Sequence, residues 1–230
     1  MSNPRGRRKP TMKFKVVLLG EGRVGKTSIL IRFCQNTFND RQQPTLQASY
    51  LDRKVTIDGQ SVSLSVWDTA GQERFHALGP IYYRDADAAL CVYDITDGDS
   101  LDRVKKWVQE LKNHASAQIV IAIAGNKIDL EKRRHVKKED ALALAKSVGA
   151  QHFDTSAKLN KGLQEAFLHL AKGLITAKKN DTGSGLDTAG TGRGRGGRNR
   201  QSRVLRIRED SDDMSADLGA AGGKKKSGCC

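Results

Sequence analysis

Residues 20–27, GEGRVGKT, combine the residue types that bind a chain of phosphates. They follow the apolar run FKVVLL and precede SILIRFC, whose apolar residues recur at helical spacing. A glycine-rich turn between a strand and a helix lets several backbone N–H groups point into one concavity. The helix N-terminus adds unpaired N–H groups and the positive end of the helix dipole. The residues expected to form this phosphate cradle are Gly20, Gly22, Arg23, Val24, Gly25, Lys26, Thr27 and Ser28.

Five side chains and backbone groups near this cradle suggest phosphate chemistry assisted by a magnesium ion. Lys26 is expected to reach the outer phosphates, and the hydroxyl of Thr27 lies where Mg²⁺ needs an oxygen. Asp68 follows a predicted strand and can hold the same ion, through a water molecule. The N–H of Gly71 can reach a terminal phosphate, and Gln72 can orient an attacking water. Lys26 and Gln72 are therefore the candidate catalytic residues, whereas Arg23 is expected to point outward into solvent.

The segment NKID at residues 126–129 predicts recognition of guanine. The carboxylate of Asp129 can accept hydrogen bonds from the N1–H and the exocyclic amine of guanine, whereas adenine would leave it unpaired. Asn126 can bridge neighbouring loops, and the stem of Lys127 can pack on the base. The segment TSAK is expected to close the pocket with Ser156, Ala157 and Lys158.

These groups need a scaffold, and the chain supplies alternating strands and helices. Strands are predicted over residues 13–20, 88–95, 119–127 and 151–158, and a hairpin over 49–68 turns at Asp58-Gly59. Helices are predicted over residues 26–35, 101–113, 137–149 and 163–177. The fold expected is α/β, with a mostly parallel six-stranded sheet covered by helices on both faces. In such sheets ligands bind at the carboxyl ends of the strands, and DTAGQE, GNKID and DTSAK all follow predicted strand ends.

Composition divides the 230-residue chain into three parts. We expect a basic, disordered extension at residues 1–12, one folded domain at 13–177, and a disordered tail at 178–230 in which packing cannot offset chain entropy. The net charge of +14 comes largely from the runs RGRRK, GRGRGGRNRQSRVLRIR and KKK. Such tails favour phosphate-bearing partners, either nucleic acid or an anionic membrane. No apolar run predicts a membrane span or a signal peptide, so we expect a cytosolic protein with free thiols.

The motifs GEGRVGKT, DTAGQE, NKID and TSAK, in this order, resemble those of Ras-like small GTPases. The resemblance covers residues 14–177. WDTAGQERF, YYR and the terminal Cys-Cys resemble the Rab family, and KFKVVLLGEG, TLQAS and ERFHALGPIYYRDA resemble its early-endosomal branch. This resemblance implies a P-loop NTPase fold of the Ras-like type and a switch between GDP-bound and GTP-bound states. It further implies slow hydrolysis of GTP and a role in endosomal vesicle trafficking.

The resemblance also implies roles for individual residues. Thr45 matches the switch threonine that coordinates Mg²⁺ and senses the γ-phosphate, and Phe38 matches the aromatic ring that stacks edge-on against guanine. Tyr50, Trp67 and Tyr82 match an aromatic triad on which effectors dock, although simple core packing is the alternative for these three rings. Gly22 matches the position that leaves room for the catalytic glutamine.

The implied partners are regulators and a membrane. The sequence shows no clear arginine that could act on the phosphates from within the chain, so a GTPase-activating protein is expected to supply that charge. The family further implies an exchange factor, a GDP-dissociation inhibitor, a prenyltransferase with its escort protein, and effectors. Geranylgeranyl groups on Cys229 and Cys230, beside KKK, would anchor the tail stably. The expected location is the cytoplasmic face of endomembranes, at the early endosome, with an inhibitor-bound cytosolic pool.

Two features of the sequence are also compatible with other functional classes. The arginine–glycine run at residues 192–208 is typical of an arm that binds nucleic acid. It lacks interleaved aromatic residues, however, and the acidic segment EDSDD follows it, so we expect no nucleic-acid partner. The other alternative is a P-loop ATPase or kinase, which displacement of bound GDP by ATP would indicate.

Overall fold

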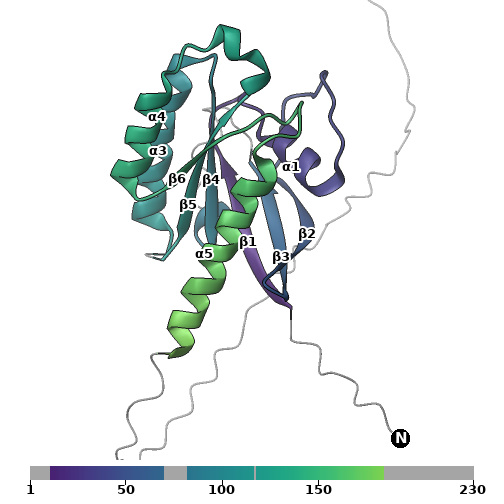
Figure 1. Ribbon diagram of the computed structural model, residues 1–230, viewed down its shortest axis with the longest axis vertical. Coiled ribbons are helices and arrows are strands. Elements are labelled where there is room, and N and C mark those ends of the chain that lie inside the picture. Colours follow the sequence, from purple (N-terminus) through teal and green to yellow (C-terminus); the bar gives the residue numbers. More distant parts are fainter. Residues whose placement is uncertain (1–10, 70–81, 117, 184–230) are drawn as a thin grey trace, which may run out of the picture. The chain divides into compact units, whose positions relative to one another are not determined.

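The computed structural model describes residues 11–69, 82–116 and 118–183, which form a six-stranded sheet between helices (Figure 1). The order across the sheet is β2-β3-β1-β4-β5-β6; β2 and β3 are antiparallel and the other pairs are parallel. The predicted α/β fold is therefore confirmed, including the hairpin turn at Asp58-Gly59. The strands are β1 Met12–Leu19, β2 Ser49–Ile57, β3 Gln60–Asp68, β4 Ala88–Asp94, β5 Val120–Asn126 and β6 Gln151–Asp154.

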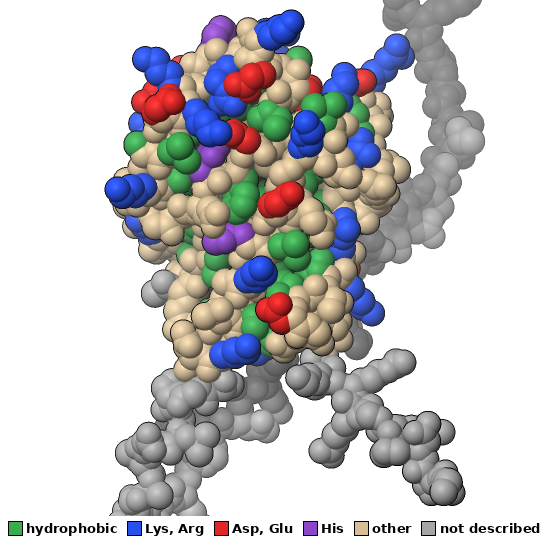
Figure 2. All heavy atoms as spheres, in the orientation of Figure 1, with side chains coloured by type: hydrophobic (Ala, Val, Ile, Leu, Met, Phe, Trp, Pro, Cys, Tyr) green, Lys and Arg blue, Asp and Glu red, His purple; other side chains and the backbone are tan. Residues whose placement is uncertain are grey.

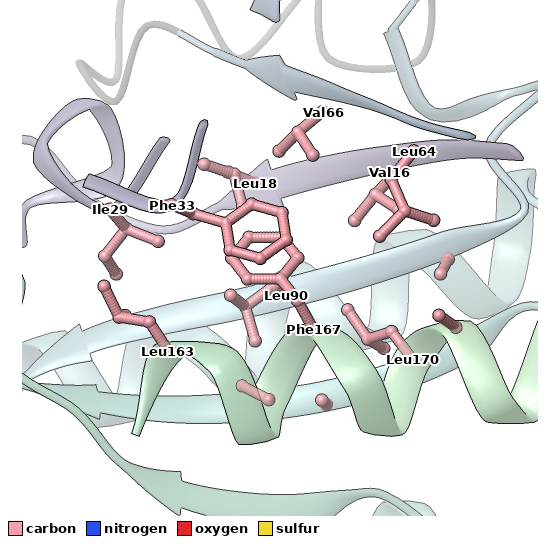
Figure 3. Packing of buried hydrophobic residues seen from close by; sticks show 14 of the residues in the cluster. Val16, Leu18, Ile29, Phe33, Leu64, Val66, Leu90, Leu163, Phe167 and Leu170 are labelled. Carbon is pink, nitrogen blue, oxygen red and sulfur yellow. The ribbon is translucent and has the colours of Figure 1, made fainter. Parts of the chain in front are cut away.

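Helices cover both faces of the sheet, and each face has its own apolar core. The described helices are α1 Lys26–Gln35, α3 Gly98–His114, α4 Lys138–Val148 and α5 Leu163–Gly183, with a 3-10 helix η2 at Ile128–Arg133. Helices α1 and α5 share one core with the sheet, and α3 and α4 share the other. In the first core the rings of Phe33 and Phe167 stack with centroids 3.7 Å apart (Figure 3). This contact fixes α1, and hence the loop before it, against α5 and the sheet.

Of the predicted helix ends, that of α4 is confirmed, whereas that of α5 is wrong. Helix α4 stops at Gly149, which adopts φ 73° and whose N–H donates to the carbonyls of Ala145 and Lys146, so the predicted cap is confirmed. Helix α5 instead continues past its predicted end at residue 177 to Gly183. Apolar periodicity stops there, but the ammonium of Lys178 lies 5.4 Å from the centroid of the Phe14 ring, which keeps the next turn against β1.

The carboxyl ends of the strands meet along one edge, where the sequence placed its motifs. Leu18 of β1 pairs with Asp68 of β3, and Asp94 of β4 pairs with Asn126 of β5. Gly125 of β5 pairs with Asp154 of β6. This register brings the carboxyl ends of β1, β3, β5 and β6 to the same edge of the sheet. Such an edge is where an α/β sheet binds its ligand.

The strongly basic runs lie outside the described residues. On the face of the domain drawn in Figure 2, Lys and Arg side chains are interspersed with Asp and Glu. Among the described residues, no helix is both long and apolar enough to cross a bilayer.

Candidate functional site

A cavity of about 850 Å³ lies where the strand ends meet. Most of the residues predicted to bind a ligand line it, although they come from four separate stretches of sequence. They are Gly22, Arg23, Gly25, Lys26, Thr27, Ser28, Phe38, Thr45, Asn126, Lys127, Asp129, Ala157 and Lys158.

Other predicted residues lie behind the cavity wall or outside the described residues. Val24 and Asp68 are buried, at 1% and 0% exposed, and Ser156 is completely buried as well. These side chains act on the cavity through the residues they contact. Gly71 and Gln72, and the thiols of Cys229 and Cys230, fall outside the described part of the chain.

The loop between β1 and α1 needs glycine at two positions because other groups approach it closely. Gly20 has φ 145°, and a Cβ there would lie 2.2 Å from the carbonyl oxygen of Val92. Gly25 has φ 98°, and a Cβ there would lie 2.5 Å from Nδ2 of Asn126. Arg23, at φ 67°, is exposed at the rim, as expected. The loop is therefore shaped by tight contact with β4 and β5, and its first helical turn opens toward the cavity.

Lys26 is a buried cation held by backbone carbonyls. Its Nζ donates to the carbonyl oxygens of Gly20 at 2.8 Å and Glu21 at 3.0 Å, and the residue is only 5% exposed. Burial lowers the pKa of Lys26 to about 8, although the charges of Asp68 and Glu21 act in the opposite direction. A desolvated ammonium that has no direct carboxylate partner among the described residues is well placed to receive an anion.

Three oxygen-bearing side chains meet beside Lys26. The hydroxyl of Thr27 lies 2.6 Å from Oδ2 of Asp68 and 2.6 Å from the hydroxyl of Thr45. Oδ2 of Asp68 also accepts from Thr45 at 3.3 Å, while its Oδ1 is buried with no hydrogen-bond partner in the described structure. Burial raises the pKa of Asp68, partly offset by these hydroxyls and by Lys26.

This corner fits a small, hard cation. Mg²⁺ prefers oxygen ligands from hydroxyls, carboxylates and water, and the unpartnered carboxylate oxygen is the group that such an ion or its water would satisfy. The described residues contain no cluster of three His, Cys, Asp or Glu side chains. A site built from one carboxylate and two hydroxyls is consistent with that finding.

At the other end of the cavity, Asn126 joins three loops. Its Nδ2 donates to the carbonyl of Val24 at 2.9 Å, and its Oδ1 accepts from the N–H of Ala157 at 3.3 Å and the hydroxyl of Thr155 at 3.4 Å. The bridging role expected for Asn126 is therefore observed. It fixes the loop after β6 to the loop after β1.

The neighbouring side chains of NKID are also held in place. Ser156 donates through its hydroxyl to Oδ1 of Asp129 at 2.6 Å, which orients the carboxylate on the cavity wall. The ammonium of Lys127 lies 2.5 Å from Oδ2 of Asp94, so its stem runs along the wall. Both arrangements leave the cavity end with an acceptor carboxylate and an apolar stem, which suits a purine with adjacent N–H donors.

Two of the three aromatic residues assigned to partner docking lie together. The rings of Tyr50 and Trp67 stack with centroids 4.8 Å apart, and Tyr50 is 53% exposed. The ammonium of Lys15 lies 4.8 Å from the centroid of the Trp67 ring, and Trp67 is only half-buried. Tyr82 is half-buried at the start of a described segment. Because Tyr50 and Trp67 face outward, core packing alone does not account for them.

Sequence reasoning missed the contacts that brace the cavity from outside. Arg103 of α3 lines the cavity and forms an ion pair with Glu21 at 2.8 Å, and Oε1 of Glu21 accepts from the N–H of Gly22 at 3.2 Å. Arg32 of α1 donates to the loop after β6. The position of Glu21 between two glycines was a usable signal; neither arginine lies in a recognisable motif.

The chain is similar to known proteins over most of its length. The model of the Ras family matches residues 15–176. Ras-related protein Rab-21 from Homo sapiens is 57% identical over 183 residues, covering 78% of this chain and 81% of that protein. The Bos taurus Rab-21 is 55% identical over 188 residues, covering 81% and 85% of the two chains. Rab-21 from Dictyostelium discoideum is 48% identical over 217 residues, covering 94% and 96%.

The pKa of Lys26 yields a prediction about protons. If phosphates enter the cavity, their charge raises that pKa, so Lys26 takes up a proton when GDP binds to the nucleotide-free protein. We expect an uptake of about half a proton per GDP at pH 8 and about one-tenth at pH 7, where the ammonium is already protonated. The affinity for GDP should therefore fall as the pH rises above 8.

Calorimetric titration in buffers of different ionisation enthalpy measures this uptake directly. The pH 7 experiment is the internal control. Equal proton uptake at both pH values would contradict the assignment of Lys26 as the phosphate-binding cation.

Proposed function

The chain belongs to the Ras family, and we propose that the cavity at its strand ends is the guanine-nucleotide site of a Rab-type switch with the residue roles given below. The chain is a GTP-hydrolysing small GTPase of the Rab group, in its endosomal branch, and it takes part in vesicle trafficking. The early-endosomal resemblance deduced from the sequence is thereby confirmed at the level of the branch.

One observation carries the assignment of the site. A buried ammonium and a three-oxygen corner occupy one end of the cavity, while an oriented carboxylate occupies the other end. The ammonium and the three oxygens suit phosphates with their counter-ion, and the carboxylate suits the donor edge of guanine. A nucleoside diphosphate or triphosphate satisfies both ends at once.

We assign the hydrolytic roles as follows. Lys26 neutralises charge on the phosphates, and the N–H groups of residues 22–28 bind their oxygens. Thr27 and Thr45 would hold Mg²⁺ directly and Asp68 through a water; the ion supplies charge stabilisation on the phosphate oxygens. Gln72, outside the described residues, would orient the attacking water.

At the base, we propose that the stem of Lys127 packs on the plane of guanine and that the ring of Phe38 stacks edge-on against it. Asp129 accepts from its N1–H and amine, while Ser156, Ala157 and Lys158 form the closing loop. The half-buried Phe38 and Lys127 both line the cavity, which supports this assignment.

The output of the switch is a change of surface that partners read. Regulators and effectors act on GTPases of this family, and we propose that they include a GTPase-activating protein, an exchange factor, a GDP-dissociation inhibitor and a prenyltransferase with its escort protein. The only arginine other than Arg23 that lines the cavity in the described residues is Arg103, which is paired with Glu21. This supports the need for an arginine supplied by a partner. Tyr50, Trp67 and Tyr82 are the proposed effector contacts.

Because α5 continues to Gly183, the predicted tail at 178–230 begins later than expected, and we further propose that residues 184–230 act as a tether. Geranylgeranyl groups on Cys229 and Cys230, next to the lysines of KKKSG, would hold the domain on the cytoplasmic face of early endosomes, with an inhibitor-bound pool in the cytosol. Two lipid chains anchor a protein far more stably than one.

The base assignment predicts a change of nucleotide in the Asp129→Asn variant. An asparagine amide can accept from N1–H but donates where guanine also donates, whereas xanthine carries a carbonyl at that position. The wild-type protein should release GDP or GTP on denaturation. The variant should bind GDP roughly 10³-fold more weakly and prefer xanthosine diphosphate. Asp140→Asn, on the exposed first turn of α4, is the matched control.

Competition binding with both nucleotides measures this preference. A wild-type protein that purifies without guanine nucleotide and ignores added GDP would refute the proposed function itself.

The proposed role of Gln72 predicts that Gln72→Leu loses roughly 10³-fold of the hydrolysis rate stimulated by an activating protein. The leucine cannot orient the attacking water, although GTP should still bind. Single-turnover release of phosphate measures the rate, and Gln109→Leu on the exposed face of α3 is the control. An unchanged stimulated rate would remove Gln72 from the mechanism.

The tether predicts that a Cys229→Ser, Cys230→Ser double variant stays in the supernatant when cell membranes are pelleted. Cys34→Ser, which removes a half-buried thiol within the domain, should pellet like the wild type. Pelleting of the double variant at the wild-type level would show that the terminal thiols do not anchor the protein.

A further inference from the structure

We propose that Arg32 is a positioning residue that holds the guanine end of the cavity closed and thereby sets how fast the nucleotide leaves. This inference rests on the proposed function and adds a residue that lies in none of the four nucleotide-binding motifs. Part of the resistance to nucleotide release would then come from a residue on the outer side of the pocket wall.

All three guanidinium nitrogens of Arg32 donate hydrogen bonds, two to the loop after β6 and one to the end of α1. Nε donates to the carbonyl of Ala157 at 2.8 Å, Nη2 to that of Lys158 at 3.3 Å, and Nη1 to that of Asn36 at 3.0 Å. The guanidinium carbon also lies 5.7 Å from the centroid of the Phe38 ring. The rigid planar fork of arginine makes this set of contacts possible, and a lysine could not reproduce it.

The contacted residues are those that line the guanine end. Ala157, Lys158 and Phe38 all line the cavity. Arg32 therefore binds the backbone of the pocket wall from behind, on the side away from the ligand. Its contacts also join the end of α1 to a loop 125 residues further along the chain.

Two further contacts join the same segments but are exposed. The ammonium of Lys158 lies 3.3 Å from Oδ1 of Asp40, and Nδ2 of Asn160 donates to Oδ1 of Asn36 at 3.2 Å. Exposed contacts of this kind contribute little on average. The bond from Nε of Arg32 to Ala157 is instead partly buried, whereas its bond to Lys158 is exposed. Because the partly buried bond is also strengthened by the charge of the guanidinium, we take Arg32 as the strongest connection between α1 and this loop.

Release of the base requires Phe38 and the loop after β6 to separate. Moving this loop away from α1 breaks the bonds of Arg32 to Ala157 and Lys158. These bonds therefore oppose release of the base but not hydrolysis, which occurs at the phosphate end. Arg32→Ala should therefore raise the rate of GDP dissociation roughly tenfold or more, in keeping with the loss of two charge-assisted hydrogen bonds. Arg32→Lys, which retains one charged donor, should give an intermediate rate.

The experiment loads the full-length protein with fluorescent GDP and follows its release into excess unlabelled GDP, with Mg²⁺ and again with a chelator. The fold increase caused by Arg32→Ala should be similar in both conditions, because removing the ion loosens only the phosphate end. Single-turnover hydrolysis of bound GTP should stay within about twofold of the wild type. A purely structural role would not separate these two rates.

Arg53→Ala is the matched control. Arg53 of β2 lies over the ring of Phe33, 4.4 Å from its centroid, so its guanidinium also packs on α1, but Arg53 does not line the cavity. This variant should release GDP at the wild-type rate.

Several outcomes overturn the inference. Release of GDP from Arg32→Ala at the wild-type rate would overturn it, and so would an acceleration by Arg53→Ala as large as that caused by Arg32→Ala. If the alanine variant does not fold, an Arg32→Lys protein that retains GDP as long as the wild type overturns it. Failure of the wild-type protein to hold GDP at all would instead refute the proposed function.

Discussion

The amide of Asn126 is the contact on which the rest of the site depends, because it fastens together loops that are far apart in the chain. It is 2% exposed, so the carbonyl of Val24 and the N–H of Ala157 would be buried without a partner if it were absent. Gly25 lies so close to it that no Cβ fits between them. The glycine of one motif and the asparagine of another are thus in direct contact, which fixes the separation of the two loops that line the cavity.

The two ends of the cavity are held by different chemistry. The guanine end is held by peptide groups, the amide of Asn126 and the guanidinium of Arg32, and none of these contacts uses a phosphate. The phosphate end depends on charge: burial lowers the pKa of Lys26 below its value in the unfolded chain. The charged form of Lys26 therefore opposes folding below about pH 8, and an incoming anion relieves that penalty. The empty site is electrostatically unfavourable, and the ligand completes it.

The sequence predicted the sheet, the hairpin and the cavity lining because each leaves a local trace. Apolar runs and alternating apolar residues mark strands, and a glycine-lysine-threonine turn between a strand and a helix marks a phosphate site. The extra turns of α5 left no such trace, since Lys178 is held by its stem against Phe14 of a distant strand. Arg32 and the Glu21–Arg103 pair were missed for the same reason. Each joins segments that become neighbours only when the chain has folded, and an arginine in a helix is ordinarily a solvated one.

The position of Thr45 explains how a change at the phosphates can alter the surface without releasing the base. Thr45 lies between α1 and β2 in a stretch without helix or strand, and its hydroxyl contacts only Thr27 and Asp68 among the hydrogen bonds described. Its neighbour Leu46 is 65% exposed, and Tyr50 follows at the start of β2. Loosening the threonine therefore moves exposed apolar residues directly. Phe38, at the other end of the same stretch, remains against Arg32. The segment is thus held at its guanine end by the contact with Arg32, whereas its phosphate end is held only as long as Thr45 keeps its contacts with Thr27 and Asp68. Hydrolysis and nucleotide release can therefore be separate events.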